Sequence, residues 1–272
     1  MIEEQKGAAE AETLLEELGF EELPIVPIDV ANAINCDDFR LVMEYQDFQS
    51  DKILGKAEGN SRGALIYINK NIPDAGRLNF TASHEIGHVC MHVIPQKRLS
   101  FECGTKELSD SFNDPVEKQA NGFASGLLMP KRLITLHSDC DVNWRNISTI
   151  SKLCGASLEA TYRRLSFLQK SPSALVIHKD GNFKRFVASR NFEFFIDRTP
   201  LSEEQISLIV DVKDDRYPMD FDTVDASDWV NTSSKSDKLD TIYSSTILLN
   251  DGYTYTILSY DDDCIAEESE NY

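Results

Sequence analysis

Apolar residues recur at helical intervals near the start of the chain and then give way to strand-like runs. Residues 8–19 carry apolar side chains at helical spacing, and a short second helix is expected around residues 30–34. Three segments with the composition of strands follow, "FRLVMEYQ", "DKILGKAEG" and "RGALIYINK", and the turn "GNSRG" separates the last two. The opening of the chain therefore predicts two helices followed by three strands.

Two longer helices are predicted in the middle of the chain. The first covers residues 78–93, and a loop over residues 98–113 separates it from the second. In "DPVEKQANGFASGLLMP", Asp114 suits the N-cap and Pro115 the first helical position, and the helix is expected to end before Pro130. Shorter helices are then predicted near residues 131–137, 147–154 and 157–169.

The hydrophobic pattern changes after residue 170. The segments "ALVIHKDGNFKRFVASR" and "STILLNDGYTYTILSYD" each hold an Asp-Gly turn between two strand-like runs, which predicts two β-hairpins. We therefore place a domain boundary near residues 170–173. Helices in the first part and hairpins in the second predict an α+β protein.

The composition limits where such a protein works. The 272 residues are enough for one large domain or two ordinary ones, each with its own core. No run of eighteen apolar residues occurs and the first residues are acidic, so we expect no membrane span and no signal or transit peptide. The six cysteines show no CxxC spacing, which favours reduced thiols in a cytoplasmic protein over a cysteine-built zinc site.

The net charge of −19 is concentrated near the C-terminus. Residues 200–272 hold 18 acidic and four basic side chains, so −14 of the total lies there. Such a charge repels a polyanion, and direct binding of nucleic acid is therefore not expected. We interpret this part chiefly as a solvated acidic surface, and a face that meets a basic partner is the alternative.

The pattern "HEIGH" carries the most specific chemistry in the sequence. Residues four apart lie on one face of a helix, so the imidazoles of His84 and His88 can reach one ion, and zinc readily takes two histidines. Glu85 projects beside that ion, where it can accept a proton from metal-bound water and pass it to a leaving amine. Gly87 costs about 1 kcal/mol relative to alanine inside a helix, so a close neighbour or the metal is expected to need its space.

A third histidine, His92, extends the stripe but does not suit the role of a third ligand. Eight residues of continuous helix rise about 12 Å between His84 and His92, which is too far for one ion with bonds near 2 Å. We expect His92 to be a neighbour of the site. The third ligand must come from elsewhere, and the candidates are Glu117, Glu102 and Glu107. Glu117 opens the second long helix, with Asn121 one turn later, where an amide oxygen can hold a ligand imidazole.

Three blocks resemble the ImmA/IrrE family of metallopeptidases in their order and spacing: "RLNFTASHEIGHVCMH", "EKQANGFASGLLMP" and "ISKLCGASLEATYRRLSFL". The resemblance covers about residues 10–170. It implies metal ligands at His84, His88 and Glu117, a general base at Glu85, and a bound Zn²⁺, with Mn²⁺ as the alternative. It also implies a partner, since the family cleaves helix-turn-helix repressors in stress, phage or mobile-element responses. Residues 173–272 match no part of the family.

The resemblance sharpens the predicted architecture. We expect a minimal zincin-like metallopeptidase domain with a small antiparallel sheet over residues 1–138, a helical subdomain over 139–170, and an acidic β-rich α+β domain of unknown role over 173–272. The subdomain has the outline of a helix-turn-helix with Gly155 at its turn, and residues 141–170 hold five basic and two acidic side chains. We interpret it as a helical packing unit rather than a DNA-binding module.

Hydrolysis of a peptide bond in a protein substrate is the function that this sequence predicts. The strand "ALIYINK" is a candidate edge for an extended substrate, and Tyr162, Arg163 and His92 are unranked candidates for stabilising the oxyanion. The alternative function is a DNA- or protein-binding regulator in which the metal is structural or sensory and no proteolysis occurs.

Overall fold

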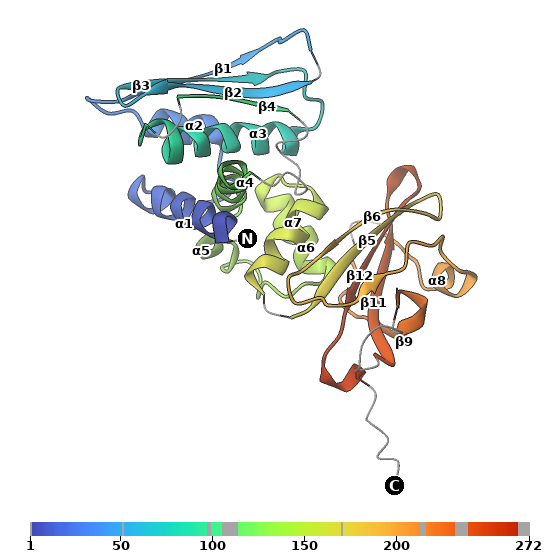
Figure 1. Cartoon of the computed structure of the whole chain (residues 1–272). Coiled ribbons are helices and arrows are strands. Elements are labelled where there is room, and N and C mark those ends of the chain that lie inside the picture. Colours follow the sequence, from blue (N-terminus) through green and yellow to red (C-terminus); the bar gives the residue numbers. More distant parts are fainter. Residues whose placement is uncertain are drawn as a thin grey trace. The chain divides into compact units, whose positions relative to one another are not determined.

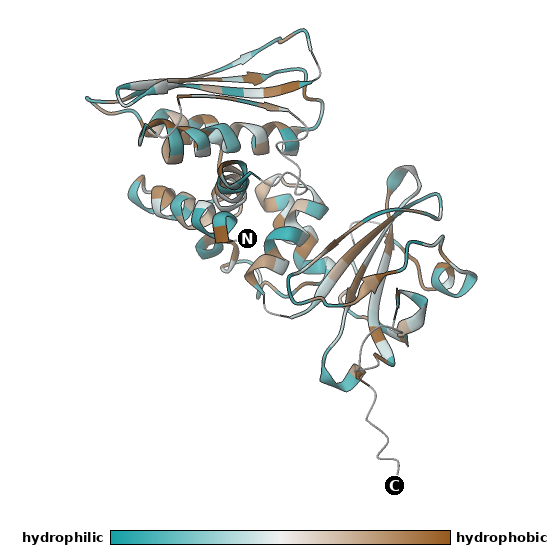
Figure 2. Cartoon of the chain, in the orientation of Figure 1, coloured by the Kyte–Doolittle hydropathy of each residue, from teal (hydrophilic) through white to brown (hydrophobic). Residues whose placement is uncertain are grey.

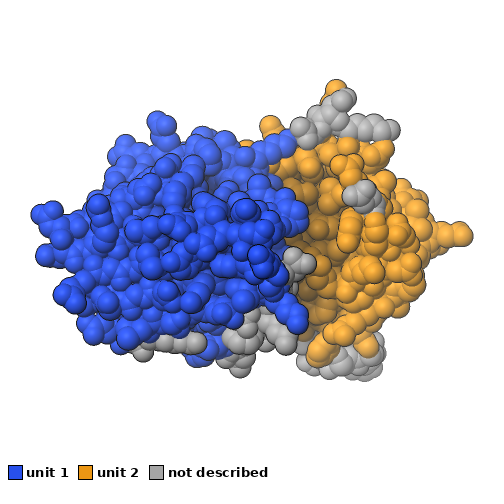
Figure 3. All heavy atoms as spheres, turned by 90° about the horizontal axis from the view of Figure 1, so that it is seen from above, with its two compact units in different colours: residues 1–137, 150–157 blue, residues 138–149, 158–272 orange. Residues whose placement is uncertain are grey.

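The computed structural model describes residues 2–50, 52–96, 99–104, 114–169, 171–212, 216–231 and 239–265 (Figure 1). The chain forms two compact units. The first consists of residues 1–137 and 150–157, and the second of residues 138–149 and 158–272 (Figure 3). Helices and strands occur in both, so the fold is α+β, as predicted. The three-domain limits at residues 138–139 and 170–173 stay predictions.

The first unit contains a four-stranded sheet in the order β1-β3-β2-β4. Its strands are β1 (Arg40–Gln46), β2 (Ile53–Asn60), β3 (Gly63–Asn69) and β4 (Ser100–Gly104). β2 and β3 form a hairpin, β4 adds to β2 antiparallel, and β1 adds to the free side of β3 in parallel. The sheet is therefore mixed, because the hairpin leaves β3 open to a strand that enters from the N-terminal side.

Three expectations about this sheet were wrong. The sheet is not wholly antiparallel, because β1 pairs with β3 in parallel. The segment "ALIYINK" lies in β3, whose two edges are both paired, so it has no free edge for a substrate strand. Within the predicted loop, residues 100–104 form β4, which pairs with β2 on one side and has no described strand on the other. Its burial alternates, with Phe101 and Cys103 turned inward and Glu102 outward. Such a short alternating strand is hard to distinguish from a loop in sequence.

Helices pack against one face of this sheet and against one another (Figure 1). They are α1 (Ile2–Glu17), α2 (Pro27–Ala33), α3 (Ala75–His88), the π-helical turn η1 (Val89–Val93), α4 (Pro115–Leu128) and α5 (Lys131–Ile134). α3 lies between the sheet and α4, and α1 packs along α4. As predicted, Asp114 caps α4 by accepting from the Val116 amide, Pro115 is its first residue, and the helix ends before Pro130.

The contact between α1 and α4 depends on small residues. A Cβ placed on Gly122 would overlap the backbone of Glu4, and one on Gly126 would lie 2.7 Å from the Cα of Ala8. Gly7 of α1 leaves equivalent room for the backbone of α4. Backbones can approach this closely only where neither helix presents a side chain. The sequence "GAAEA" in α1 and the "NGFASG" stretch of α4 thus determine how deeply the two helices interlock.

Two helices follow, α6 (Trp144–Cys154) and α7 (Leu158–Leu168), with Gly155 in a left-handed conformation after α6 (φ +61°). Ile147, Ile150 and Leu165 are fully buried, as expected for packing residues, whereas Leu153 and Leu158 are half-buried. These buried faces are what the apolar spacing predicted.

The second unit contains a larger, mainly antiparallel sheet in the order β6-β5-β12-β11-β8, with β9 also paired to β11 and a separate ribbon formed by β7 and β10. The strands are β5 (Ser173–Lys179), β6 (Asn182–Ala188), β7 (Phe195–Ile196), β8 (Val210–Asp211), β9 (Asp222–Asp225), β10 (Val230–Asn231), β11 (Thr241–Leu248) and β12 (Tyr253–Ser259). The short elements are α8 (Glu203–Ser207) and the 3-10 turns η2 (Ala226–Asp228), η3 (Asn250–Gly252) and η4 (Asp262–Cys264). Both predicted hairpins are present, as β5–β6 and β11–β12.

β5 forms the centre of the second unit's core, and Figure 2 shows its hydrophobic colour. Ala174 and Val176 pack there with Trp229 and Leu258. Trp144, which precedes this sheet by almost thirty residues, is fully buried and donates its indole N–H to the Ser245 carbonyl at 2.9 Å. None of the described helices is long and apolar enough to cross a membrane.

Candidate metal centre

Helix α3 delivers the HExxH residues into the interior of the first unit. Asp74 caps the helix by accepting from the Arg77 amide at 2.7 Å, and every residue from Thr81 to His88 is buried. The hydroxyls of Thr81 and Ser83 donate to backbone carbonyls one turn earlier, so these buried polar groups are satisfied within the helix. A helix buried on all sides over its last two turns is what the uncharged flanks of "HEIGH" require.

The two histidines meet through their Nε2 atoms. His84 Nε2 lies 2.9 Å from His88 Nε2, and the ring planes cross at 83°. Burial lowers the pKa of His88 to about 3, with the nearby Glu117 carboxylate acting in the opposite direction. The imidazole is therefore neutral at physiological pH, which is the form that binds a metal ion.

Glu117 reaches the same point from the first turn of α4. Its Oε2 lies 3.2 Å from His84 Nε2 and 3.3 Å from His88 Nε2. Burial would raise the pKa of this carboxyl, but the interactions with both histidines outweigh burial and leave the pKa below its ordinary value. Glu102 projects from the outer face of β4 and is exposed, and Glu107 lies outside the described residues. Of the two candidate carboxylates that the structure describes, Glu117 is the one that lies against the histidines.

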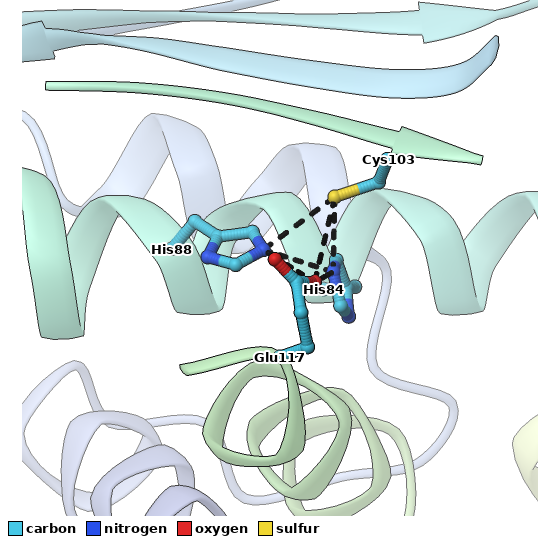
Figure 4. A group of neighbouring side chains, drawn as sticks. All are labelled: His84, His88, Cys103 and Glu117. Carbon is cyan, nitrogen blue, oxygen red and sulfur yellow. Dashed lines mark hydrogen bonds and ion pairs between the residues drawn. The ribbon is translucent and has the colours of Figure 1, made fainter. Parts of the chain in front are cut away.

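A fourth side chain, Cys103, also points at this group. Its Sγ lies 3.2 Å from His84 Nε2, 3.5 Å from His88 Nε2 and 3.9 Å from Glu117 Oε2. Figure 4 shows Cys103 approaching from β4 and Glu117 from α4, with the two imidazoles of α3 between them. Cys103 was not predicted as a ligand, because a cysteine outside CxxC spacing carries no metal-site signal of its own in the sequence. The alternation in "SFECG", with Phe101 and Cys103 on one face, is the signal that would have placed it.

The outer nitrogens of both imidazoles have partners that fix the rings. His84 Nδ1 lies 2.9 Å from Asn121 Oδ1, and His88 Nδ1 lies 3.2 Å from His92 Nδ1. His92 Nε2 in turn lies 2.9 Å from Gln119 Oε1. Hydrogen bonds of this kind set the tautomer and the direction of a metal-binding imidazole. Asn121 and His92 thus contact the histidines and not the point where the four donor atoms meet, which is the arrangement expected from the sequence.

The π-helical turn explains how His92 reaches its position. Residues 89–93 are wound more loosely than an α-helix, and such turns inside helices are frequent at functional sites. The ring of Phe101 stacks on His88 with centroids 4.0 Å apart and an interplanar angle of 16°. This stacking covers His88 on the side of the sheet and excludes water from it.

Glu85 lies deep beside the histidines and is fully buried. Neither of its carboxylate oxygens has a hydrogen-bond partner among the described residues. Burial raises the pKa of Glu85 to about 8; the Cys103 thiol lowers it somewhat, and the Glu117 charge raises it further. A Cβ on Gly55 of β2 would lie 2.5 Å from Glu85 Oε1, so the glycine makes the space that this carboxylate occupies.

Gly87 has a neighbour as close as the sequence predicted. A Cβ at this position would lie 2.9 Å from the Cβ of Phe123 in α4. The glycine therefore lets α3 and α4 approach, which brings Glu117 within reach of the histidines. The neighbour that needs the space is an aromatic side chain rather than the ion.

All three candidates for stabilising the oxyanion have partners within the protein. The Tyr162 hydroxyl lies 3.2 Å from Ser173 Oγ and is fully buried, and burial raises its pKa. Arg163 pairs with Glu159 at 2.9 Å. His92 is the candidate that lies next to the histidine pair.

The donor set fits a transition-metal ion. Two imidazoles, a carboxylate and a sulfur converge, and nitrogen, oxygen and sulfur are the donors that zinc takes in proteins. The buried, unpartnered carboxylate of Glu85 beside them is costly in an apolar interior, and a bound cation would stabilise its charge. His84, His88 and their neighbours can therefore hold a metal, whose identity the donor types leave open between zinc and related ions.

Comparison with known proteins agrees with the motifs. Residues 36–166 match the family model described as the IrrE N-terminal-like domain, Peptidase_M78, which confirms the resemblance found in the sequence. Among solved structures, a Mycobacterium tuberculosis transcriptional regulator is similar, with a TM-score of 0.50 and 13% identity over 93% of this chain and 76% of that one. At this identity the likeness is one of fold. No curated protein matches the chain.

Proposed function

We propose that the chain is a metal-dependent endopeptidase, on the premise that residues 36–166 match the IrrE N-terminal-like domain of a peptidase family. The observation that carries the proposal is the convergence of His84, His88 and Glu117 with the buried carboxylate of Glu85 beside them. Two histidines and one glutamate are a ligand set of catalytic zinc sites, which reserve a further position for the reaction. Zn²⁺ is the proposed metal and Mn²⁺ the alternative.

Each of these residues has a defined part in the proposed reaction. The ion, when bound, supplies Lewis acidity for the scissile carbonyl and for water. Glu85 is the proton acceptor and later the donor to the leaving nitrogen, and a pKa raised towards neutrality suits a group that must do both. Asn121 and His92 hold the imidazoles in the orientation that binding requires.

The substrate is proposed to be a helix-turn-helix repressor, in keeping with the family resemblance of the three sequence blocks. Direct binding of nucleic acid has little support in the helical segment. In this segment Arg163 pairs with Glu159, and Arg164 is buried. These two side chains are therefore engaged within the protein, where they are not available to phosphates.

A cleavage assay with the helix-turn-helix protein encoded next to this chain tests the proposal. The repressor should be cut in the presence of Zn²⁺ or Mn²⁺ by the wild type and not by Glu85→Gln, which keeps the shape of the side chain but removes its basicity. Glu102→Gln is the matched control, because this carboxylate is exposed on the opposite face of β4 and should leave cleavage unchanged. Cleavage that survives in Glu85→Gln would contradict the proposed role of this residue.

The alternative function, a regulator with a structural or sensory metal, is favoured by one observation. Cys103 completes a set of four donors, and structural zinc sites have four protein ligands and no open position. That function predicts binding of duplex DNA or of a protein partner that depends on the metal and is equally strong in Glu85→Gln. Equal binding by both variants, together with no cleavage, would favour the regulator.

A further inference from the structure

The four donor atoms at the metal centre form a nearly regular tetrahedron. Among the Nε2 atoms of His84 and His88 and Oε2 of Glu117, the separations are 2.9, 3.2 and 3.3 Å. The distances from Cys103 Sγ to the same three atoms are 3.2, 3.5 and 3.9 Å. All six separations thus lie between 2.9 and 3.9 Å, and Cys103 Sγ occupies the corner of the tetrahedron that the other three donor atoms leave open.

This tetrahedron of donor atoms has the dimensions of a zinc site. A regular tetrahedron with edges of about 3.3 Å has its centre about 2.0 Å from each corner, close to the lengths of zinc–nitrogen and zinc–oxygen bonds. The somewhat longer distances to sulfur agree in direction with the longer zinc–sulfur bond, about 2.3 Å. The sulfur is therefore positioned to bind the same ion as the other three donors.

A closed set of four ligands and the buried base Glu85 point to different uses of the site. A purely structural metal gains nothing from a carboxylate with two unpartnered oxygens in the core, because such a group costs stability. A hydrolytic site needs that base but also needs a coordination position that the protein does not fill. Both features are accounted for if the fourth ligand can leave.

We propose that Cys103 is the fourth metal ligand in the resting protein and that the peptidase is latent until this sulfur is displaced. The sulfur departs with its electron pair and takes up a proton from solvent, and one coordination position of the ion becomes free. No oxidant is required. The first half of this inference concerns coordination alone, and the second half rests on the proposed peptidase function.

Cobalt spectroscopy of the whole protein tests the coordination. Co²⁺ added to metal-free wild type should give the near-ultraviolet sulfur-to-cobalt charge-transfer absorption together with visible bands of a four-coordinate ion. Cys103→Ser should lose the charge-transfer absorption and keep visible bands, because His84, His88 and Glu117 remain. Cys36→Ser is the matched control, since this thiol is exposed and lies outside the cluster, and it should behave as the wild type. If the wild-type protein binds cobalt and its spectrum lacks the sulfur-to-cobalt band, the inference is overturned.

Displacement is tested on the same samples with acetohydroxamate, a small probe that binds metals. In Cys103→Ser the probe should shift the visible bands at low concentration, because a position is open. In the wild type it should bind at least tenfold more weakly and should remove the sulfur band as it binds. A sulfur band that persists at saturating probe would identify a permanent ligand and overturn the latent state.

These outcomes separate the inference from the proposed function. If the wild type binds cobalt without the sulfur band and still cleaves the repressor, the role of Cys103 is contradicted and the proposed peptidase function stands. Permanent sulfur coordination with no cleavage contradicts both. Faster cleavage by Cys103→Ser than by the wild type, alongside loss of the sulfur band, supports both.

Discussion

The imidazole of His88 shows how single residues are adapted to the metal centre. Burial holds its pKa at about 3, Phe101 covers its face, and His92 contacts its outer nitrogen. Burial keeps the imidazole neutral, and the two neighbouring rings hold the nitrogen that faces the donor cluster in a fixed direction. The same logic applies to His84, whose outer nitrogen lies against Asn121.

Removing a donor and removing a neighbour of a donor should therefore differ. His84→Ala and Glu117→Ala are expected to lose stoichiometric metal, because each deletes an atom of the donor set. His92→Ala should retain the metal, since His92 contacts His88 and not the donor cluster. Asn121→Ala should weaken metal affinity about 10–100-fold, the range typical of such supporting groups. Metal analysis of the purified variants measures the first two effects and competition with a chelator the third; full metal in Glu117→Ala would contradict the ligand assignment.

Gly55 should be as important for catalysis as a residue that contacts the substrate. In Gly55→Ala the new methyl group would lie 2.5 Å from Glu85 Oε1 and 2.9 Å from its Cγ, so the carboxylate must move. We expect cleavage to fall by about 100-fold or more, the order of effect of a 1 Å misplacement, with metal content retained.

A double variant provides the control for Gly55→Ala. If the glycine acts through Glu85, Gly55→Ala should cause no further loss in a Glu85→Gln background. An additional loss there, or a fall in bound metal, would show that the substitution disturbs the ligands or the fold instead.

Close packing between helices is what positions these residues at the scale of elements. α4 brings Glu117 to α3 because Gly87 admits Phe123, and α1 fits against α4 because Gly7, Gly122 and Gly126 admit the opposing backbone. β4 brings Cys103 to the same point from the sheet. The donor set is thus assembled from three elements, and a glycine sets the spacing between two of them, α3 and α4.

Gly122→Ala should destabilise the first unit, because the added Cβ would overlap the backbone of Glu4, which cannot move away as a flexible side chain would. We expect a loss of about 1–3 kcal/mol in the free energy of unfolding, the usual cost of overpacking. Chemical denaturation measures it, and Ser125→Ala, a half-buried position on the same helix, should change stability much less. Equal stability of Gly122→Ala and the wild type would mean that α1 packs elsewhere.

Two units with separate cores make up the whole molecule, and the second includes residues that precede its sheet in the chain. Trp144 belongs to it through its hydrogen bond to Ser245 and its ring contact with Tyr255 at 6.4 Å. The segment 138–149 therefore contributes to the stability of the C-terminal sheet.

Trp144→Ala should destabilise the second unit by about 3–5 kcal/mol, the range for deleting a buried large aromatic side chain. Hydrogen exchange measured along the chain should show faster exchange in β11 and β12, while α3 and α4 of the first unit keep their protection. Trp144→Phe, which keeps most of the apolar volume but loses the donor, should have a smaller effect. Equally faster exchange in both units would contradict the view that Trp144 stabilises the core of the second unit alone.

The sequence by itself determined most of the longer elements and half of the metal centre. Helical and strand periodicity, the Asp114 cap and the Asp-Gly turns act over a few residues, so they can be read locally, and the same is true of the HExxH spacing. The choice of Glu117 among the candidate carboxylates needed the resemblance of sequence blocks, because nothing local relates α4 to α3.

Only the tertiary structure decided which distant residues join that centre. Cys103, Gly55 and Phe101 lie on strands that approach α3 through sheet pairing, and pairing partners depend on contacts between segments far apart in the chain. The position of β3 inside the sheet, which removed it as a substrate edge, follows from the same long-range pairing. Local periodicity identifies a strand and its inward face, but the free energy that selects its neighbours comes from packing the whole unit.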